Sequence, residues 1–440
     1  MKHIRILQVL AITAVLGLML GCGQGVPRIE VGADGYGNTT LANGMTVLVN
    51  HDVSTELTAA RVLIGGGVLT ETADNNGITN LMTRMILKGN DKMKAAEITE
   101  ELDFLGANVN SDCFRDYSTI SMVSLTENFE KVLEIVAASL AAPSFPADEL
   151  DKLKHEVKGD LKAINDNQNQ SSSLLFWKTA YGDKAYGLPY FGSDETVDKI
   201  TAEGIRAHYM KYVGGKNMIV SISTDLPAAQ AMAMIDKYLG PLKAEADVVG
   251  DPKAELQAGH EGFISFDRNQ SFIYTGYVLD HLSPAEVAYV TLINEIMGGS
   301  VSARLWYLRQ TEKLAYAVYT QYNTDKYGAI FRAAIGTDTT KVKKALSSLK
   351  REFDKLIADG LTADELTDAK VNLKNNMIYR IDRKSNRANN MAYYEYIGYG
   401  YRFPLDLIAM ADDISLAQVN DFITANFTDD RMYLSIVGKK

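Results

Sequence analysis

Residues 197–223 read VDKITAEGIRAHYMKYVGGKNMIVSIS, and residues 411–437 read ADDISLAQVNDFITANFTDDRMYLSIV. Aligned without a gap, the two segments carry apolar residues at matching positions: Ile200 with Ile414, Ile205 with Val419, and Met218 with Met432. Each segment predicts an amphipathic helix, a short turn and a strand. The string ADEL also occurs twice, at residues 147–150 and 363–366, and each copy opens a long helical stretch. Two matches in nearly the same register indicate a duplicated domain.

The duplication divides the chain of 440 residues into two similar units. Residues 240–260 carry two prolines and several charges with little apolar periodicity, which is typical of a linker. We therefore predict a tether at 22–35, an N-terminal domain at 36–238, a linker at 239–258 and a C-terminal domain at 259–440. Strand-like runs alternate irregularly with helical stretches, so each domain should have an α+β fold, a mixed β-sheet with helices packed on one face.

The composition excludes several classes of protein. Apolar residues make up 46% of the chain and charged residues 23%, which rules out a disordered, collagen-like or multi-span membrane protein. A net charge of −10 argues against nucleic-acid binding. The two cysteines, Cys22 and Cys113, are too few for a disulfide scaffold or a cysteine-rich metal cluster. Six histidines remain for metal binding, at positions 3, 51, 155, 208, 260 and 281, and no two have ligand spacing. The contiguous His155–Glu156 is read as a solvated helix face.

The amino terminus resembles a bacterial lipoprotein signal. Lys2 and Arg5 precede an apolar run at residues 6–20, and Gly21–Cys22 follows it. The resemblance implies removal of residues 1–21 and acylation of Cys22; the alternative is an ordinary secretory signal with an incidental cysteine. Loss of Lys2 and Arg5 changes the net charge from −10 to −12 and leaves Cys113 without a partner. We expect a lipid anchor in the bacterial cell envelope. Gly23 gives no inner-membrane retention signal, which favours the outer membrane, facing the periplasm.

Residues 41–50, LANGMTVLVN, and residues 60–90, ARVLIGGGVLTETADNNGITNLMTRMILKGN, resemble the pitrilysin/insulysin family of zinc metallopeptidases. The resemblance extends over essentially the whole mature chain and implies two domains around a central chamber. In active members, the segment matching residues 77–89 is a helix carrying H-x-x-E-H, whose histidines bind zinc and whose glutamate activates water. Here the matching positions are Asn80, Thr83 and Arg84.

These replacements are incompatible with zinc catalysis. Asn80 is a poor ligand, Thr83 is no base near neutral pH, and Arg84 puts a permanent cation where zinc would lie. The third family ligand, a glutamate on a later helix, matches Asp160, and a family glutamate seven residues earlier matches Leu153. We therefore expect no metal and no catalytic residue in this chain. Arg84 and Asp160 could form an ion pair in place of the metal, or each could be separately solvated.

Residues 297–320, MGGSVSARLWYLRQTEKLAYAVYT, resemble the second-domain signature of the same family. In active members an arginine holds the substrate backbone, and a tyrosine seven residues later donates to the developing oxyanion. The matching residues are Arg309 and Tyr316. The alternative is a surface arginine on a helix and a tyrosine packed in a strand. The tyrosines at 393, 394, 396, 399 and 401 could line a chamber, but core packing is the preferred interpretation.

Together these features resemble the silent subunit of a heterodimeric member such as the mitochondrial processing peptidase. The implied partner is a family subunit with intact H-x-x-E-H, which would hold the zinc. Peptide substrate would add as a strand to a sheet edge, and the negative charge would favour basic or neutral peptides. Two alternatives stay open: an active zinc metalloendopeptidase with an atypical site, and a purely structural scaffold lipoprotein.

Overall fold

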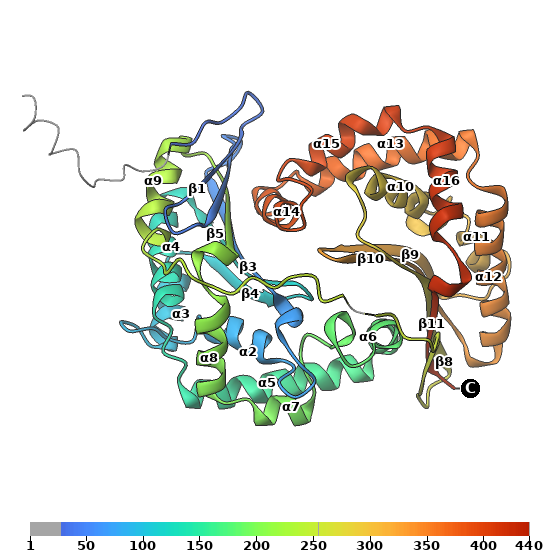
Figure 1. Ribbon diagram of the computed structural model, residues 1–440, viewed down its shortest axis with the longest axis horizontal. Helices are drawn as coiled ribbons and strands as arrows, with labels where there is room; N and C mark the ends of the chain where they lie inside the picture. The colour runs from blue at the N-terminus through green and yellow to red at the C-terminus, as the bar shows by residue number, and fades with distance from the viewer. Residues whose placement is uncertain (1–27, 254, 440) are drawn as a thin grey trace, which may run out of the picture.

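The computed structural model describes residues 28–253 and 255–439, so the signal peptide and Cys22 lie outside the described residues. Two mixed β-sheets form the framework, one in each half of the chain (Figure 1). The strands of the first sheet are β1 (Tyr36–Thr40), β2 (Thr46–His51), β3 (Leu57–Gly65), β4 (Asn108–Cys113), β5 (Tyr117–Leu125) and β6 (Met218–Thr224). Those of the second are β7 (Glu261–Ser265), β8 (Gln270–Leu279), β9 (Ala317–Asp325), β10 (Gly328–Asp338) and β11 (Met432–Gly438).

The two sheets repeat one topology. The first has the order β1-β2-β6-β3-β5-β4 and the second β7-β11-β8-β10-β9. In each sheet the last strand along the chain pairs in parallel with an early one, β6 with β2 and β11 with β7, and the following pairs are antiparallel. The segments that revealed the repeat are α8 (Ala202–Tyr212) leading into β6 and α16 (Leu416–Asn426) leading into β11. The predicted α+β fold is confirmed, and β1 is an addition to the first sheet.

Helices cover both sheets. The other helices of the first half are α2 (Ile78–Met85), α3 (Ala95–Phe104), α4 (Thr126–Ala141), α5 (Ala147–Asp166), α6 (Gln168–Tyr181), α7 (Asp194–Lys199) and α9 (Ala228–Leu239). Those of the second half are α10 (Pro284–Asn294), α11 (Trp306–Gln310), α12 (Val342–Asp359), α13 (Ala363–Arg380), α14 (Lys384–Tyr396) and α15 (Phe403–Met410). The described helices include none that is long and apolar enough to cross a membrane.

The two halves exchange one helix each. Helix α6 leaves the first half and packs on β11 and β8 of the second sheet, and α14 leaves the second half and packs on β3 and β6 of the first (Figure 1). Phe176 and Trp177 of α6 are buried in one cluster with Tyr274 and Tyr433 of the second sheet. Each sheet therefore has helices of its own half on one face and a helix of the other half on the opposite face.

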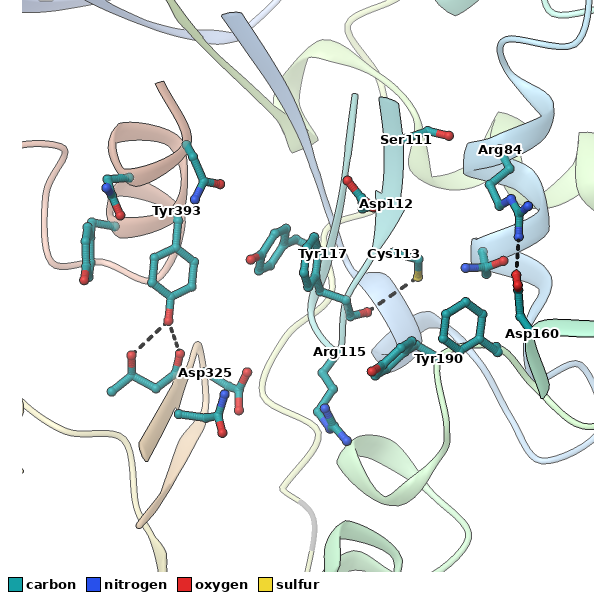
Figure 2. A pocket seen from close by; sticks show the side chains of 18 of the residues that line it. Arg84, Ser111, Asp112, Cys113, Arg115, Tyr117, Asp160, Tyr190, Asp325 and Tyr393 are labelled. Atoms are coloured by element: carbon teal, nitrogen blue, oxygen red, sulfur yellow. Dashed lines mark hydrogen bonds and ion pairs between the residues drawn. The ribbon is translucent and has the colours of Figure 1, made fainter. Parts of the chain in front are cut away.

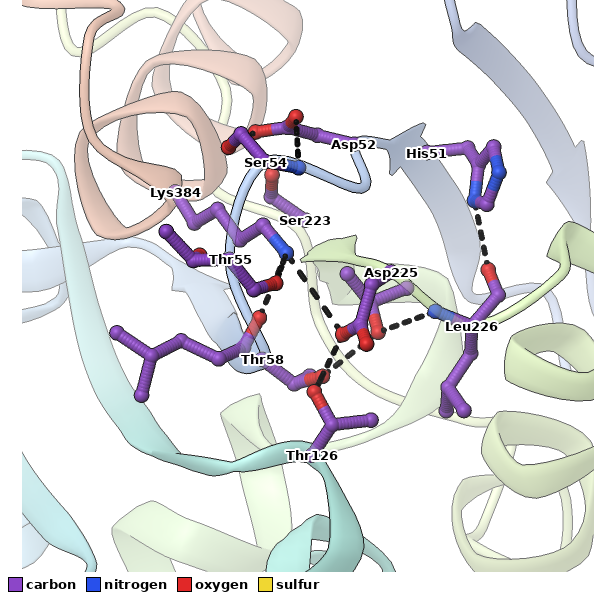
Figure 3. Close-up of polar contacts among 12 residues, drawn as sticks. His51, Asp52, Ser54, Thr55, Thr58, Thr126, Ser223, Asp225, Leu226 and Lys384 are labelled. Carbon is purple, nitrogen blue, oxygen red and sulfur yellow. Dashed lines mark hydrogen bonds and ion pairs between the residues drawn. The ribbon is translucent and has the colours of Figure 1, made fainter.

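Helix α14 is fixed by a buried lysine at its start (Figure 3). The Lys384 ammonium donates to the carbonyl oxygens of Thr55 and Leu57 at 2.7 and 2.8 Å and lies 3.7 Å from the Asp225 carboxylate. Its side chain is only 5% exposed, and this burial lowers its pKa. Further along α14, the carbonyl oxygen of Ala388 accepts a 2.6 Å hydrogen bond from the Ser221 hydroxyl of β6.

The segment between the halves is extended but attached to both. Between α9 and β7, the described residues form neither helix nor strand. The backbone N–H of Gln257 donates to the carbonyl of Ala180 at the end of α6, and the carbonyl of Gln257 accepts from the Tyr433 hydroxyl of β11. Earlier in the segment, the Lys243 carbonyl accepts from the Gly215 N–H. These contacts hold the segment along the junction of the two halves.

Candidate functional site

Helix α2 carries three of the four zinc-site positions, and a buried carboxylate holds its first turn. The N-cap Gly77 has a φ of 96°, a conformation that a side chain disfavours. Glu71 supplies the missing cap: one carboxylate oxygen accepts from the Gly77 N–H and the other from the Thr79 N–H, both at 2.8 Å. Burial raises the pKa of Glu71 to about 7, although these hydrogen bonds oppose the shift. The apolar side of the helix, including Leu81 and Met85, packs into the core of the first half.

The side chains at the three zinc-site positions of α2 differ in their contacts with the rest of the protein. The Thr83 hydroxyl is buried and donates to the Thr79 carbonyl at 2.8 Å. The Asn80 side chain is buried, and its Oδ1 has no hydrogen-bond partner among the described residues. Arg84 reaches helix α5, where its guanidinium donates to Asp160 at 3.3 Å (Figure 2). It also donates to Glu156 at 3.0 Å. The Arg84–Asp160 ion pair is thus present, and Glu156 is a second acceptor that the sequence did not predict.

The residues at this place do not fit zinc. One amide oxygen and one carboxylate remain as donors, and the carboxylate is already paired with a cation. Within the described ranges, no group of three or more His, Cys, Asp or Glu side chains could hold a metal ion. The described histidines are engaged elsewhere; for example, His208 bonds to the Thr79 and Thr70 hydroxyls, and burial lowers its pKa to about 4. We derive no catalytic step through a metal in this chain.

A hollow between the two halves adjoins this position. Asn80, Arg84 and Asp160 line a cavity of about 700 Å³ together with residues of β9, α13 and α14. A second cavity, of about 800 Å³, continues from it. The two share five lining residues: Arg115, Asp160, Tyr190, Phe191 and Asn323. The edge strands β4 and β9 both run along the first cavity, since Ser111, Asp112 and Cys113 line it on one side and Asn323, Thr324 and Asp325 on the other. Cys113 is a buried thiol without a disulfide among the described residues.

The expectation of an acidic chamber is wrong. The charged residues that line the two cavities are four arginines and three aspartates: Arg84, Arg115, Arg332, Arg380, Asp112, Asp160 and Asp325. Burial raises the pKa of Asp325 to about 8, so near neutral pH this aspartate is largely protonated. The cavity walls are therefore weakly positive, because the excess negative charge of the chain lies on other surfaces.

The tyrosines of α14 and the following loop serve two purposes. Tyr394 and Tyr399 are in the core of the second half, as predicted. Tyr393 and Tyr394 also line the cavity, so the alternative that these tyrosines line a chamber holds for these two. The Tyr393 hydroxyl contacts Thr324 of β9, and the Tyr396 hydroxyl donates to the Asp116 carbonyl at 2.5 Å. These tyrosines therefore connect α14 to the edge of both sheets.

Arg309 and Tyr316 lie apart from this cavity, and neither lines it. Arg309 is exposed on α11, and its guanidinium lies 4.7 Å from the Trp306 ring centroid. Tyr316 is 62% exposed and directly precedes β9, where its N–H donates to the Gly336 carbonyl. Helices α11 and α2 lie at opposite sides of the molecule (Figure 1). Within one chain, the second-domain pair does not meet the α2 position.

Two hairpins, one from each sheet, meet beside the first cavity, and no feature of the sequence predicted this contact. Arg115 and Asp116 lie between β4 and β5, whereas Asp325 is the last residue of β9 and Lys326 follows it. The Asp116 carboxylate accepts a 2.6 Å hydrogen bond from the Lys326 N–H, and burial raises its pKa to about 6. Charged residues in hairpin turns are usually at the surface, so the sequence held no signal for this cluster.

Comparison with protein families places these features in one group. A family model described as "Insulinase (Peptidase family M16)" matches residues 46–194, and one described as "Peptidase M16 inactive domain" matches residues 199–373. The chain belongs to peptidase family M16. The expected membership of the pitrilysin/insulysin family is confirmed, and the chain lacks the H-x-x-E-H motif of the family's active members.

Relatives of known sequence and structure agree over nearly the full length. The chain is 22% identical over 392 residues to an uncharacterized zinc protease, YmxG, of Bacillus subtilis (89% of this chain, 95% of the relative). It is 23% identical over 380 residues to a non-peptidase homolog, YmxG, of Helicobacter pylori (86% and 87%). A peptidase M16 inactive domain from Pseudomonas fluorescens superposes with a TM-score of 0.86 at 20% identity (94% and 98% covered). A Helicobacter pylori protease superposes with a TM-score of 0.84 at 19% identity (94% and 100% covered).

Proposed function

We propose that this chain is the non-catalytic subunit of a zinc metallopeptidase. It pairs with a separate family subunit that carries intact H-x-x-E-H, and it helps to bind the peptide that this partner cleaves. The observation that carries the proposal is the contrast between the two halves. Arg84, held by Glu156 and Asp160, occupies the place of a zinc ligand in the first half, whereas Arg309 and Tyr316 of the second half remain exposed.

Because Arg309 and Tyr316 are exposed, their side chains are available to contact another chain. Arg309 and Tyr316 line neither cavity beside α2. Within the described residues, Arg309 contacts the Trp306 ring, and neither its guanidinium nor the Tyr316 hydroxyl makes a hydrogen bond. An exposed guanidinium can hold backbone carbonyls, and a phenol hydroxyl can donate to a developing oxyanion. In the proposed pair, both groups complete the zinc site of the partner.

The edge strands support the binding of peptide. Strands β4 and β9 each end a sheet, so each offers unpaired backbone N–H and C=O groups along one side. Both contribute residues to the cavity beside α2. An extended peptide would gain main-chain hydrogen bonds from either strand.

Reconstitution with a family subunit bearing H-x-x-E-H, from the same source organism, tests the pairing. The expected result is a stable complex with chelator-sensitive peptide hydrolysis that neither chain shows alone. Tyr316→Phe should lower kcat by about a hundredfold to a thousandfold, the range seen when one oxyanion donor is removed, and Arg309→Ala should also lower turnover. Arg268→Ala, which changes an exposed arginine outside both cavities, should leave turnover unchanged.

Other results of the same experiment separate the alternatives. Stoichiometric zinc and hydrolysis by this chain alone would establish an active peptidase with an atypical site. A complex whose turnover does not respond to either substitution would remove the role proposed for Arg309 and Tyr316. Failure to form any complex would favour the scaffold lipoprotein.

We also propose that Cys22 anchors the complex by lipidation in the cell envelope, at the outer membrane and facing the periplasm. The lipoprotein-like signal at residues 1–22 supports this. Wild-type protein should fractionate with membranes and incorporate labelled palmitate, and Cys22→Ser should lose the label. Cys113→Ser, which changes the buried thiol, is the matched control.

A further inference from the structure

Arg115 lies where the two cavities join and lines both of them. Its guanidinium stacks on the Trp177 ring at 3.9 Å from the centroid and lies 5.6 Å from the centroid of Tyr190. Its Nε donates to the Tyr186 carbonyl at 3.3 Å. Figure 2 shows Arg115 beside Tyr190, between Asp325 and Asp160. Stacking on Trp177 restricts the side chain to one orientation, so the position of the cation is fixed before any ligand binds.

The outer nitrogens of Arg115 have no acceptor in the described part of the chain. An arginine has five N–H donors, and the Tyr186 carbonyl accepts the only hydrogen bond that this side chain makes there. No ion pair joins it to a described carboxylate, and burial lowers its pKa. The two nearby carboxyls, Asp325 and Asp116, make no ion pair with Arg115, and burial raises the pKa of both.

The other three arginines that line the cavities differ from Arg115 in this respect. The Arg380 side chain has a hydrogen bond to Tyr394. Arg84 is paired with Glu156 and Asp160. Arg332 donates to the carbonyl and the hydroxyl of Ser173 at 3.2 and 2.8 Å. Arg115 therefore presents an unused pair of parallel donors toward the hollow, which is the arrangement that binds a planar carboxylate with two hydrogen bonds.

We propose that Arg115 binds a carboxylate of the peptide held between the two halves, an inference that rests on the proposed function. A single negative charge matches a single unpaired guanidinium. A phosphate group, with nearly two charges, would bring its second charge close to the carboxylates of Asp112 and Asp160, which line the same hollow. Trp177 and Tyr190 would contact the apolar part of the residue that carries the carboxylate.

Two sources of the carboxylate are compatible with the strands. Arg115 follows the end of edge strand β4 by two residues. A peptide added to β4 in the parallel sense would bring its carboxyl terminus to Arg115. A peptide in the antiparallel sense would instead place a side chain there, so an aspartate or glutamate would supply the group.

Fluorescence anisotropy with labelled octapeptides of alanine, leucine, tyrosine and serine tests the inference on the purified chain. One peptide has a free carboxyl terminus, the second is its amide, and the third is an amide with one internal glutamate. The free acid or the glutamate peptide should bind at least about tenfold more tightly than the plain amide, as expected for a charge-assisted pair of hydrogen bonds. Whichever peptide does so identifies the source of the carboxylate.

Arg115→Gln should reduce that preference to less than about twofold, and Arg115→Lys, which keeps the charge but loses the paired donors, should retain part of it. Arg268→Gln, an exposed arginine outside both cavities, should leave the preference unchanged. Equal binding of all three peptides to the wild-type chain would overturn the carboxylate inference and leave the proposed function standing. Absence of binding by any peptide would count against peptide binding itself, and the inference would fall with it.

Discussion

Arg84 shows how one side chain replaces part of what a metal ion does. Zinc ties helix α2 to helix α5 in a family member with H-x-x-E-H, and here the guanidinium joins the same two helices through Asp160 and Glu156. The replacement is partial, because the side chains of Arg84, Asp160 and Glu156 are 23%, 49% and 54% exposed. At such exposure, solvent screens much of the attraction.

Double-mutant cycles measure this link. Arg84→Ala combined with Asp160→Ala, and separately with Glu156→Ala, should give coupling energies of about 0.5–1 kcal/mol in urea unfolding. Arg84→Ala combined with Asp166→Ala, at the unpaired end of α5, should be additive within about 0.3–0.5 kcal/mol. Additive losses in the first two cycles would mean that the ion pairs do not stabilise the fold.

Asp325 makes a pH-dependent contribution to stability. Its folded pKa of about 8 lies above its ordinary value of 3.8, because it is buried. The folded chain therefore keeps a proton that the unfolded chain releases, and the stabilising contribution is complete below about pH 4 and is lost as the pH rises through 8. Asp325→Asn removes this loss. The difference in unfolding free energy between the variant and the wild type should therefore shift in favour of the variant by about 2–3 kcal/mol from pH 5.5 to pH 8.5.

Chemical denaturation at the two pH values provides the measurement. Asn323→Ser, a change to a neutral side chain on the same strand, is the matched control and should differ from wild type equally at both pH values. A difference between Asp325→Asn and wild type that does not change with pH would show that Asp325 is ionised in the folded chain throughout this range.

At the scale of elements, α14 is the most informative, because a helix of the second half depends on backbone acceptors in the first. Lys384→Ala removes the donor to the Thr55 and Leu57 carbonyls and leaves Asp225 without its cation. We expect a loss of about 2–3 kcal/mol in unfolding free energy, because buried acceptors are left unsatisfied.

Lys350→Ala, on the exposed side of α12, is the control and should change stability by less than about 0.5 kcal/mol. A loss no larger for Lys384→Ala than for Lys350→Ala would show that water replaces the ammonium at the Thr55 and Leu57 carbonyls. Limited proteolysis near residue 384 would report whether α14 detaches locally before the chain unfolds as a whole.

At the scale of the whole molecule, the exchange of α6 and α14 makes the two halves interdependent. We propose boundaries at 36–238 and 259–440 from the sequence, but neither segment would contain the helix that covers the inner face of its own sheet. Residues 28–238 and 259–439, expressed separately, should each expose apolar surface, bind a hydrophobic dye and self-associate. When refolded together, they should form a 1:1 complex with native circular dichroism.

Size-exclusion chromatography with light scattering distinguishes the outcomes. A cooperative, monomeric fold for either segment alone would show that the exchanged helices are dispensable. A complex that forms only on mixing would show that the packing of α6 and α14, and not the covalent connection through residues 241–260, holds the two halves together.

The amount that could be predicted differs between fold and site. Leu150, Leu153, Val157, Leu161 and Ile164 recur at helical spacing in the sequence, and all but the half-buried Ile164 are buried in α5, because helical periodicity is a local property. The alignment of Asp160 with a family ligand suggested an ion pair with Arg84 but left separate solvation open, and the structure shows the pair. Arg115 and Asp325 were not predictable, because they come from turns 210 residues apart and their burial depends on how the two sheets face each other.

The sequence by itself therefore determined the duplication, the α+β class, the family and the loss of the zinc ligands. Each of these follows from residue types at fixed spacing, which local geometry converts directly into helices, strands and missing donors. Only the tertiary structure decided that one helix of each half packs on the sheet of the other half, that Glu156 joins the Arg84 ion pair, and that the hollow between the halves is weakly positive. These features depend on burial and on contacts between distant segments of the chain. Burial raises the pKa of Asp325 and lowers that of Arg115, and it arises only when the two halves pack together.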